Sequence, residues 1–101
     1  MEYTETIERM KGGRLYYCSD ERLQAEQMQR MDKVFAFNQL PPSHLEEKAA
    51  LLREMFAEIG ENCYLETPFF SNWGGKHVHF GNGVYANFNL TLVDDGDIYV
   101  G

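Results

Sequence analysis

The sequence predicts an α+β fold, in which a helical N-terminal segment, residues 1–60, is followed by the beginning of a parallel β-helix, residues 61–101. Two observations predict it. Apolar residues in the second half recur every six positions, in the series Val78, Val84, Leu90 and Phe80, Ala86, Leu92. This period fits neither a helix nor a hairpin, but in a parallel β-helix each hexapeptide supplies one strand and one corner. The composition also changes after Gly60, where Lys and Arg nearly disappear and aromatic residues, Asn and Gly become frequent.

The first half of the chain carries helical patterns separated by turn residues. A first helix is expected from Thr4 to about Arg14, and Gly12-Gly13 ends it. Its apolar side would hold Ile7, Met10 and Leu15. Ser19-Asp20 then caps a second helix that runs to about Asn38. The inward residues of this second helix are expected to be Leu23, Met28, Met31, Val34 and Phe35.

A third helix is predicted from His44 to Ile59. Two prolines end the preceding helix because they lack backbone donors, and Ser43 with Glu46 forms a capping box. The apolar residues follow a helical spacing, so that one face packs on the core until Gly60 stops the helix. These apolar residues are Leu45, Ala49, Leu52, Phe56 and Ile59.

The second half is expected to enter its coil gradually. Cys63–Thr67 reads as a first strand, and Pro68–Lys76 as an irregular lead-in. Asn82-Gly83 alone would suggest a hairpin turn, but the six-residue period continues through it and favours a corner. Two extra residues interrupt the period within residues 93–97, which predicts a loop pushed out of one corner. Such loops often carry function because a rigid scaffold holds them while their side chains stay exposed.

The charge and composition exclude several classes of protein. The formal net charge of −7 argues against nucleic-acid binding, since phosphate neutralisation needs clustered Lys and Arg. No apolar run reaches the roughly 18 residues of a transmembrane helix, and the acidic start lacks the apolar region of a signal peptide. We therefore expect a cytoplasmic protein without a membrane partner, in which Cys18 and Cys63 are free thiols.

Polar residues near the predicted corners are candidates for chemistry. Asn87 suits a turn, where its amide satisfies local backbone groups, and an amide can also bind hydroxyls. Asp94 and Asp95 lie in the predicted loop, where adjacent carboxylates are ordinarily solvated and the local spacing supplies too few oxygens for Ca²⁺. His77 and His79 point to one face of a strand and could share a metal, but no third ligand is evident.

Several motifs of the second half resemble a known family. They are the run YANFNLT at Tyr85–Thr91, the following Val93–Asp95, and the preceding Gly60–Asn62 and Pro68-Phe69. Together they resemble the hexapeptide-repeat sugar O-acetyltransferases, the galactoside and maltose acetyltransferase family, and the likeness covers essentially the whole chain. The resemblance implies the beginning of a left-handed parallel β-helix, here truncated, and a homotrimer. It also implies direct transfer of an acetyl group from acetyl-CoA to a sugar hydroxyl, with a His as general base.

The resemblance also implies which residues contact the sugar acceptor. Asn87 and Asp95 match family positions that hydrogen-bond its hydroxyls, which an amide and a carboxylate can both do. A further family contact falls in the lead-in segment, where a one-residue length difference leaves three candidates. These are Ser71, Asn72 and Trp73. Tyr85 offers an apolar face for a sugar ring, or else a packing surface for the coil wall.

Other positions depart from the family pattern or match a residue without a catalytic role. Cys18 stands after Tyr17 where the family has an Asp that touches the acceptor, and a thiol does not replace that charge. A family Arg falls at Gln27 or Met28, which removes a second charged contact. His79 matches a family histidine that is not the base, so a structural role is favoured for it. The family's catalytic His lies beyond Gly101, and no catalytic or metal-binding residue is expected within the chain.

Three functions compete at this stage. The first is the N-terminal part of a sugar O-acetyltransferase that is inactive alone, because coils bury their apolar faces on further coils and most contacts to CoA are missing. We expect no tight binding of acetyl-CoA to such a chain. The second is a non-catalytic binding or interaction module derived from that family, which recruits a partner through its open coil end. The third is a small metal protein that uses His77, His79 and the Asp pair.

Overall fold

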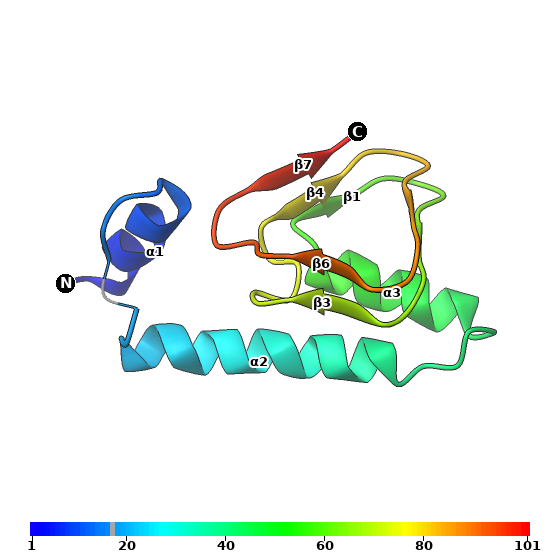
Figure 1. Ribbon diagram of the computed structural model, residues 1–101, viewed down its shortest axis with the longest axis horizontal. Coiled ribbons are helices and arrows are strands. Elements are labelled where there is room, and N and C mark those ends of the chain that lie inside the picture. The colour runs from blue at the N-terminus through cyan, green and yellow to red at the C-terminus, as the bar shows by residue number, and fades with distance from the viewer. Residues whose placement is uncertain (17) are drawn as a thin grey trace.

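A three-sided coil of short parallel strands packs against helices in this computed structural model, which describes residues 1–16 and 18–101 (Figure 1). The helices are α1 (Tyr3–Lys11), α2 (Glu21–Asn38) and α3 (Leu45–Met55). The strands are β1 (Glu58–Ile59), β2 (Tyr64–Leu65), β3 (Phe69–Ser71), β4 (Val78–Phe80), β5 (Tyr85–Ala86), β6 (Leu90–Leu92) and β7 (Ile98–Val100). Within the described residues, no helix combines the length and the apolar character that a membrane span requires.

Each side of the coil is a small parallel sheet. The strand orders are β1-β4-β7, β2-β5 and β3-β6, and each strand pairs with the equivalent strand of the next coil. Asn82-Gly83 therefore forms a corner between parallel strands and not a hairpin turn, as predicted. Glu58–Ile59 already forms a strand, and so does part of the predicted irregular lead-in, so the coil is longer than expected. These strands have only two or three residues, too few for a hydrophobic period to reveal them.

The interior of the coil and the two long helices share one core. Leu65, Phe69, Val78 and Phe80 point into the coil and are buried. Residues from α2 and from α3 with its C-cap cover them from the helical side: Val34, Phe37, Leu52, Met55 and Phe56. The rings of Phe56 and Phe80 meet edge to face with centroids 4.9 Å apart, a favourable aromatic geometry.

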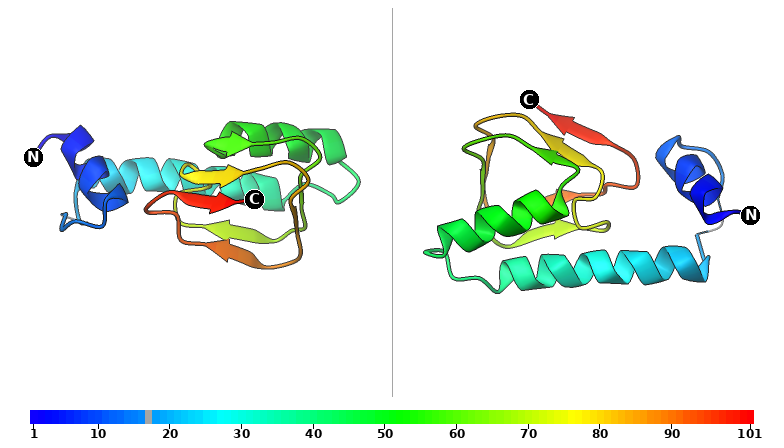
Figure 2. Two further views of the ribbon diagram at one scale, coloured as in Figure 1. Left: turned by 90° about the horizontal axis from the view of Figure 1, so that it is seen from above. Right: turned by 180° about the vertical axis from the view of Figure 1, so that it is seen from behind.

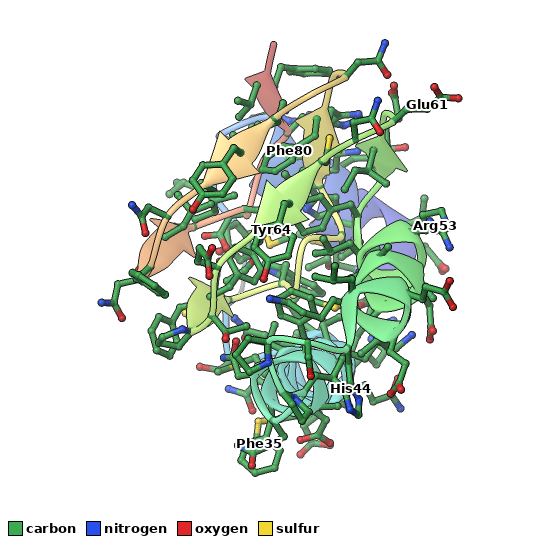
Figure 3. All side chains as sticks on the ribbon, turned by 90° about the vertical axis from the view of Figure 1, so that its right-hand side faces the viewer. Phe35, His44, Arg53, Glu61, Tyr64 and Phe80 are labelled. Carbon is green, nitrogen blue, oxygen red and sulfur yellow. The ribbon has the colours of Figure 1, made fainter. Side chains whose placement is uncertain are left out.

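The face of α2 that packs inward differs from the predicted one. Leu23 and Val34 are buried as expected, but Met28, Met31 and Phe35 are exposed, and Phe35 points away from the coil (Figure 3). Arg30 explains the difference, because it lies on the inward face and its guanidinium donates to the backbone oxygens of Trp73 and Met55. Because this charged residue interrupts the apolar residues of the packed face, the sequence did not reveal that face. The neighbouring Met and Phe residues suggested another face instead.

The ends of the other helices also differ from the predictions. His44 is the N-cap of α3 and makes no side-chain cap bond, so the capping box predicted at Ser43 does not form. The helix ends at Met55, because Phe56 adopts an extended backbone, and Ile59 belongs to β1. Leu45 and Leu15 are exposed, contrary to expectation. Asp20 caps α2 as predicted, by accepting a hydrogen bond from the backbone N–H of Arg22.

A second, smaller core joins α1 to the rest of the molecule. Met10, Leu23 and Trp73 are buried together, with Tyr16 packed against them. Helix α1 lies beside one end of α2, far from α3 (Figure 2). Its last residue, Lys11, forms an ion pair with Asp97 at 3.3 Å. The helical segment is thereby fixed to the loop that joins β6 to β7.

Candidate functional site

Two connections of the coil meet and form a network of polar contacts. They are the loop of residues 72–77 between β3 and β4, here named the β3–β4 loop, and residues 93–97 between β6 and β7, here named the β6–β7 corner. The predicted loop in the corner is present. Parallel pairing of β3 with β6 brings the ends of these two strands to the same place. The candidate residues of both segments can therefore act together.

Asp94 lies at the centre of the network and is fully buried. Its Oδ1 atom accepts hydrogen bonds from the Ser71 hydroxyl and from the backbone N–H of Trp73, the latter at 2.9 Å. Its Oδ2 atom accepts from the backbone N–H of His77 at 3.3 Å. The Nδ1–H of His77 donates in return to the backbone oxygen of Asp94 at 2.7 Å. Asp94 thus binds the corner to the loop, a role that the sequence reading of solvated carboxylates missed.

Asn72 and Asp95 form the solvent-accessible part of the network. The Asn72 side-chain oxygen accepts a hydrogen bond from the backbone N–H of Asp94 at 3.0 Å, and its NH₂ group donates to Asp95 Oδ1. Both side chains are only partly buried. An amide beside a carboxylate offers a donor and an acceptor, which is the chemistry that hydroxyl groups require.

The other two candidates of the lead-in segment have different surroundings. Ser71 is buried beneath the network, where its hydroxyl donates to Asp94 and accepts from the backbone N–H of Gly75. Trp73 is 1% exposed and belongs to the core with Met10 and Leu23. Among the three candidates, Asn72 is therefore the one whose side chain reaches solvent beside Asp95.

The connection between α1 and α2 contributes a residue that the sequence did not single out. Burial and the negative charge of Asp95 raise the pKa of the Tyr16 phenol, with a smaller contribution from Cys18. Tyr16 also packs against the core that contains Trp73, the neighbour of Asn72. Cys18 itself is an exposed free thiol, and Tyr17 lies outside the described residues.

Asn87 and Tyr85 lie at another corner of the coil. Asn87 is exposed between β5 and β6, where its side-chain oxygen accepts from the backbone N–H of Phe88 at 2.8 Å. Tyr85 donates to Glu66 at 3.0 Å and stacks on Tyr64, and its ring is largely exposed. Strand β6 separates this corner from the β6–β7 corner (Figure 1). One copy of the chain therefore does not bring Asn87 and Asp95 together.

His79 stands on the outer face of β4 between two carboxylates. Its Nδ1 atom contacts Glu58 at 2.8 Å, its Nε2 atom contacts Asp97 at 2.9 Å, and its ring stacks on Tyr99. His77 is buried and bound to Asp94, so the two histidines have separate partners. In the part of the chain that the structure describes, no group of His, Cys, Asp and Glu side chains has the geometry of a metal site.

The stability of the protein is expected to fall as the pH rises above about 6.5, the ordinary pKa of His. The hydrogen bond to Asp97, reinforced by Glu58, raises the pKa of His79 in the folded state. A raised folded-state pKa stabilises the protein fully below the unfolded value, and this contribution is lost as the pH rises through the folded value. Urea unfolding between about pH 6 and pH 9 should show this decrease in the wild type and a smaller one in His79→Gln. His44→Gln is the control, and an unchanged slope in His79→Gln would contradict the expectation.

The open end of the coil forms an apolar hollow of about 370 Å³. Its lining includes the interior residues of the second coil: Phe80, Val84, Ala86, Leu90, Leu92 and Val100. Ile98 and Val100 of β7 are half-buried. In a β-helix such a surface is covered by a further coil.

A three-sided coil of short parallel strands, preceded by a helical segment, is the architecture of hexapeptide-repeat proteins. The model of the family described as the maltose acetyltransferase hexapeptide capping motif matches residues 9–60. The chain therefore belongs to the hexapeptide-repeat sugar O-acetyltransferase family, and it corresponds to the N-terminal part of such a protein. This finding confirms the resemblance seen in the sequence.

Individual relatives agree with this assignment. The chain is 48% identical over all of its 101 residues to a galactoside O-acetyltransferase of Lactococcus lactis, of which it covers 49%. A solved galactoside acetyltransferase in complex with coenzyme A superposes with a TM-score of 0.84 at 36% identity, over 98% of this chain and 48% of that one. A maltose O-acetyltransferase from Clostridium difficile 630 gives a TM-score of 0.90 at 26% identity, over 95% and 51%. The chain thus spans about half the length of the relatives that it matches.

Proposed function

We propose that this chain is the sugar-binding part of an acetyl-CoA-dependent O-acetyltransferase, and that its coil is the beginning of a left-handed parallel β-helix. The observation that carries the proposal is the Asn72–Asp95 pair, which reaches solvent at a corner of a family fold. A cytoplasmic location remains a prediction from the sequence.

The Asn72–Asp95 pair suits a sugar hydroxyl better than a charged ligand. The Asp95 carboxylate accepts hydrogen bonds, and the Asn72 amide supplies a donor next to it. Tyr16 packs against the core that contains Trp73, the neighbour of Asn72, and burial together with the charge of Asp95 raises the pKa of its phenol. These groups would bind the acceptor and orient its hydroxyl. Correct positioning of the reactants is one source of the rate acceleration in acyl transfer.

We further propose that the acceptor site is shared between copies of a homotrimer. Asn87 and Asp95 lie at different corners of one copy, on either side of β6. In a cyclic oligomer, different corners of neighbouring copies can face one another. Asn87 of one copy would then complete the site around Asp95 of the next, with Tyr85 beside it as an apolar surface for the ring.

The residues of the coil do not fit acetyl-CoA on their own. CoA carries several phosphate charges, which cationic side chains ordinarily neutralise. Lys76 is the only Lys or Arg after Arg53 in the sequence, and it is paired with Glu26. Both histidines of the coil are also engaged in internal contacts. We therefore assign to this chain the binding of the acceptor, and neither the base nor the CoA site.

A binding experiment tests this function. Titration of the chain with a galactoside or a glucoside should raise its melting temperature, and Asp95→Asn should weaken the affinity by about tenfold or more, since it removes a charge-assisted hydrogen bond. Asp32→Asn makes the same chemical change at an exposed position of α2 and should bind as the wild type does. Release of free CoA from acetyl-CoA by the chain alone would contradict the assignment of the base to a site outside these residues.

The second candidate, a non-catalytic interaction module, is favoured by the apolar hollow at the open end of the coil. If neither sugar shifts the melting temperature and a charge at Leu92 abolishes association with a polypeptide partner, this function replaces the first. Leu92 also lines a second hollow together with Asn72, so the same loss is required with a charge at Val84, which lines the hollow at the open end.

A further inference from the structure

We propose that Asp94 is a positioning residue, which fixes Asn72 and Asp95 in the arrangement that binds a vicinal diol of the acceptor. The inference rests on the proposed sugar-binding function. It concerns a residue that does not itself reach the ligand, since Asp94 is fully buried.

The carboxylate of Asp94 binds the opposing segment. A buried carboxylate is costly unless hydrogen bonds replace its hydration. Here three donors of the opposing segment replace it: the Ser71 hydroxyl and the backbone N–H groups of Trp73 and His77. All three come from β3 and the β3–β4 loop. The carboxylate of Asp94 thus binds both neighbours of Asn72, Ser71 through its hydroxyl and Trp73 through its backbone.

The Asn72 amide is held in one orientation. The backbone N–H of Asp94 donates to the Asn72 side-chain oxygen, which forces the NH₂ group toward Asp95. A flipped amide would set two donors, the NH₂ group and the Asp94 N–H, against each other. The backbone of Asp94, which the buried carboxylate holds in place, therefore determines which end of the amide faces Asp95.

Asn72 and Asp95 each keep one group that a ligand can bind. The Asn72 NH₂ group has two hydrogens, and one of them is directed at Asp95 Oδ1. Its second hydrogen is a donor, and the second carboxylate oxygen of Asp95 is an acceptor beside it. Adjacent hydroxyls of a sugar match this arrangement, since one can accept from Asn72 while its neighbour donates to Asp95. A single hydroxyl can also accept from Asn72 and donate to Asp95, so an analogue that lacks one of the two adjacent hydroxyls distinguishes the two modes of binding.

The test compares two substitutions in the same corner. Asp94→Asn places an NH₂ group against a backbone N–H and should weaken sugar affinity about tenfold or more. Asp97→Asn is the matched control, because it lowers stability through the contacts with Lys11 and His79 but leaves Asn72 untouched. Its affinity should stay within about twofold of the wild type. Ser71→Ala removes one of the three donors, so its sugar affinity should lie between those of the other two variants. It replaces Asp94→Asn in the comparison if Asp94→Asn does not fold.

An NMR measurement separates this inference from the proposed function. The two side-chain NH₂ protons of Asn72, assigned by their loss in Asn72→Asp, should be well separated in the wild type and should converge in Asp94→Asn but not in Asp97→Asn. This readout requires no sugar, so it decides the positioning role even if no sugar binds. Wild-type NH₂ signals in both Asp94→Asn and Ser71→Ala would overturn the inference, as would an equal loss of affinity in Asp97→Asn. Equal affinity for a sugar and for its analogue without one of the two adjacent hydroxyls would contradict the binding of a vicinal diol.

Discussion

Replacement of Gly74 by alanine is expected to destabilise the protein by about 3 kcal/mol or more. Gly74 has a positive φ of 62°, which side chains rarely tolerate. A Cβ atom there would lie 2.5 Å from the backbone oxygen of Arg30 and 2.9 Å from its carbonyl carbon. These atoms belong to α2 and cannot move without shifting the helix. Strain and steric overlap therefore add at this position.

Gly83 provides the matched control for this substitution. Its φ of 67° is similar, but an added Cβ would meet no atom within 4 Å. Gly83→Ala should therefore cost only the backbone strain, about 1 kcal/mol. Urea unfolding of both variants measures the difference. Equal losses would mean that the β3–β4 loop can withdraw from α2, contrary to the close approach in the structure.

A mixture of Asn87→Ala and Asp95→Ala chains is expected to recover sugar binding that neither variant has alone. We assume that each acceptor site takes Asn87 from one copy and Asp95 from the next. In an equal mixture, half of the copies then supply an intact Asn87 and the other half supply an intact Asp95. Random assembly then yields about one quarter of the sites intact. The two variants should be unfolded together, refolded, and titrated calorimetrically with the sugar, so that the number of sites is measured.

The control for this mixture combines Asn72→Ala with Asp95→Ala. These two residues are hydrogen-bonded within one copy, so no arrangement of the mixed copies restores both at one site. This mixture should therefore bind no sugar. If the Asn87 and Asp95 mixture also fails to bind while each chain still assembles, the site is not shared between copies, and Asn87 has a local role at its own corner.

The sequence predicted the elements better than the faces they present. The spacing of apolar residues located all three helices, and the six-residue period located the corners of the second coil. It missed the inward face of α2, because Arg30 occupies that face and is satisfied by backbone oxygens far along the chain. It also extended α3 to Ile59, since an apolar residue suits both a helix and the short strand β1.

The site was predicted in its residue types but not in their arrangement. The resemblance singled out Asp95 and left Ser71, Asn72 and Trp73 equally eligible. The structure separates these three by burial, since only Asn72 reaches solvent beside Asp95. Asp94 was considered in the sequence only as a solvated carboxylate or a metal ligand, because the burial of a carboxylate cannot be recognised from its residue type.

The sequence by itself determined the class of fold, since the six-residue period, the helical stripes and the turn residues are local patterns that a linear chain records. Only the tertiary structure decided which side chains meet. Hydrogen bonds such as those from Ser71 of β3 and Trp73 of the β3–β4 loop to Asp94 join residues about one coil apart, and they depend on the parallel stacking of β3 on β6. Their geometry exists only after that stacking has formed.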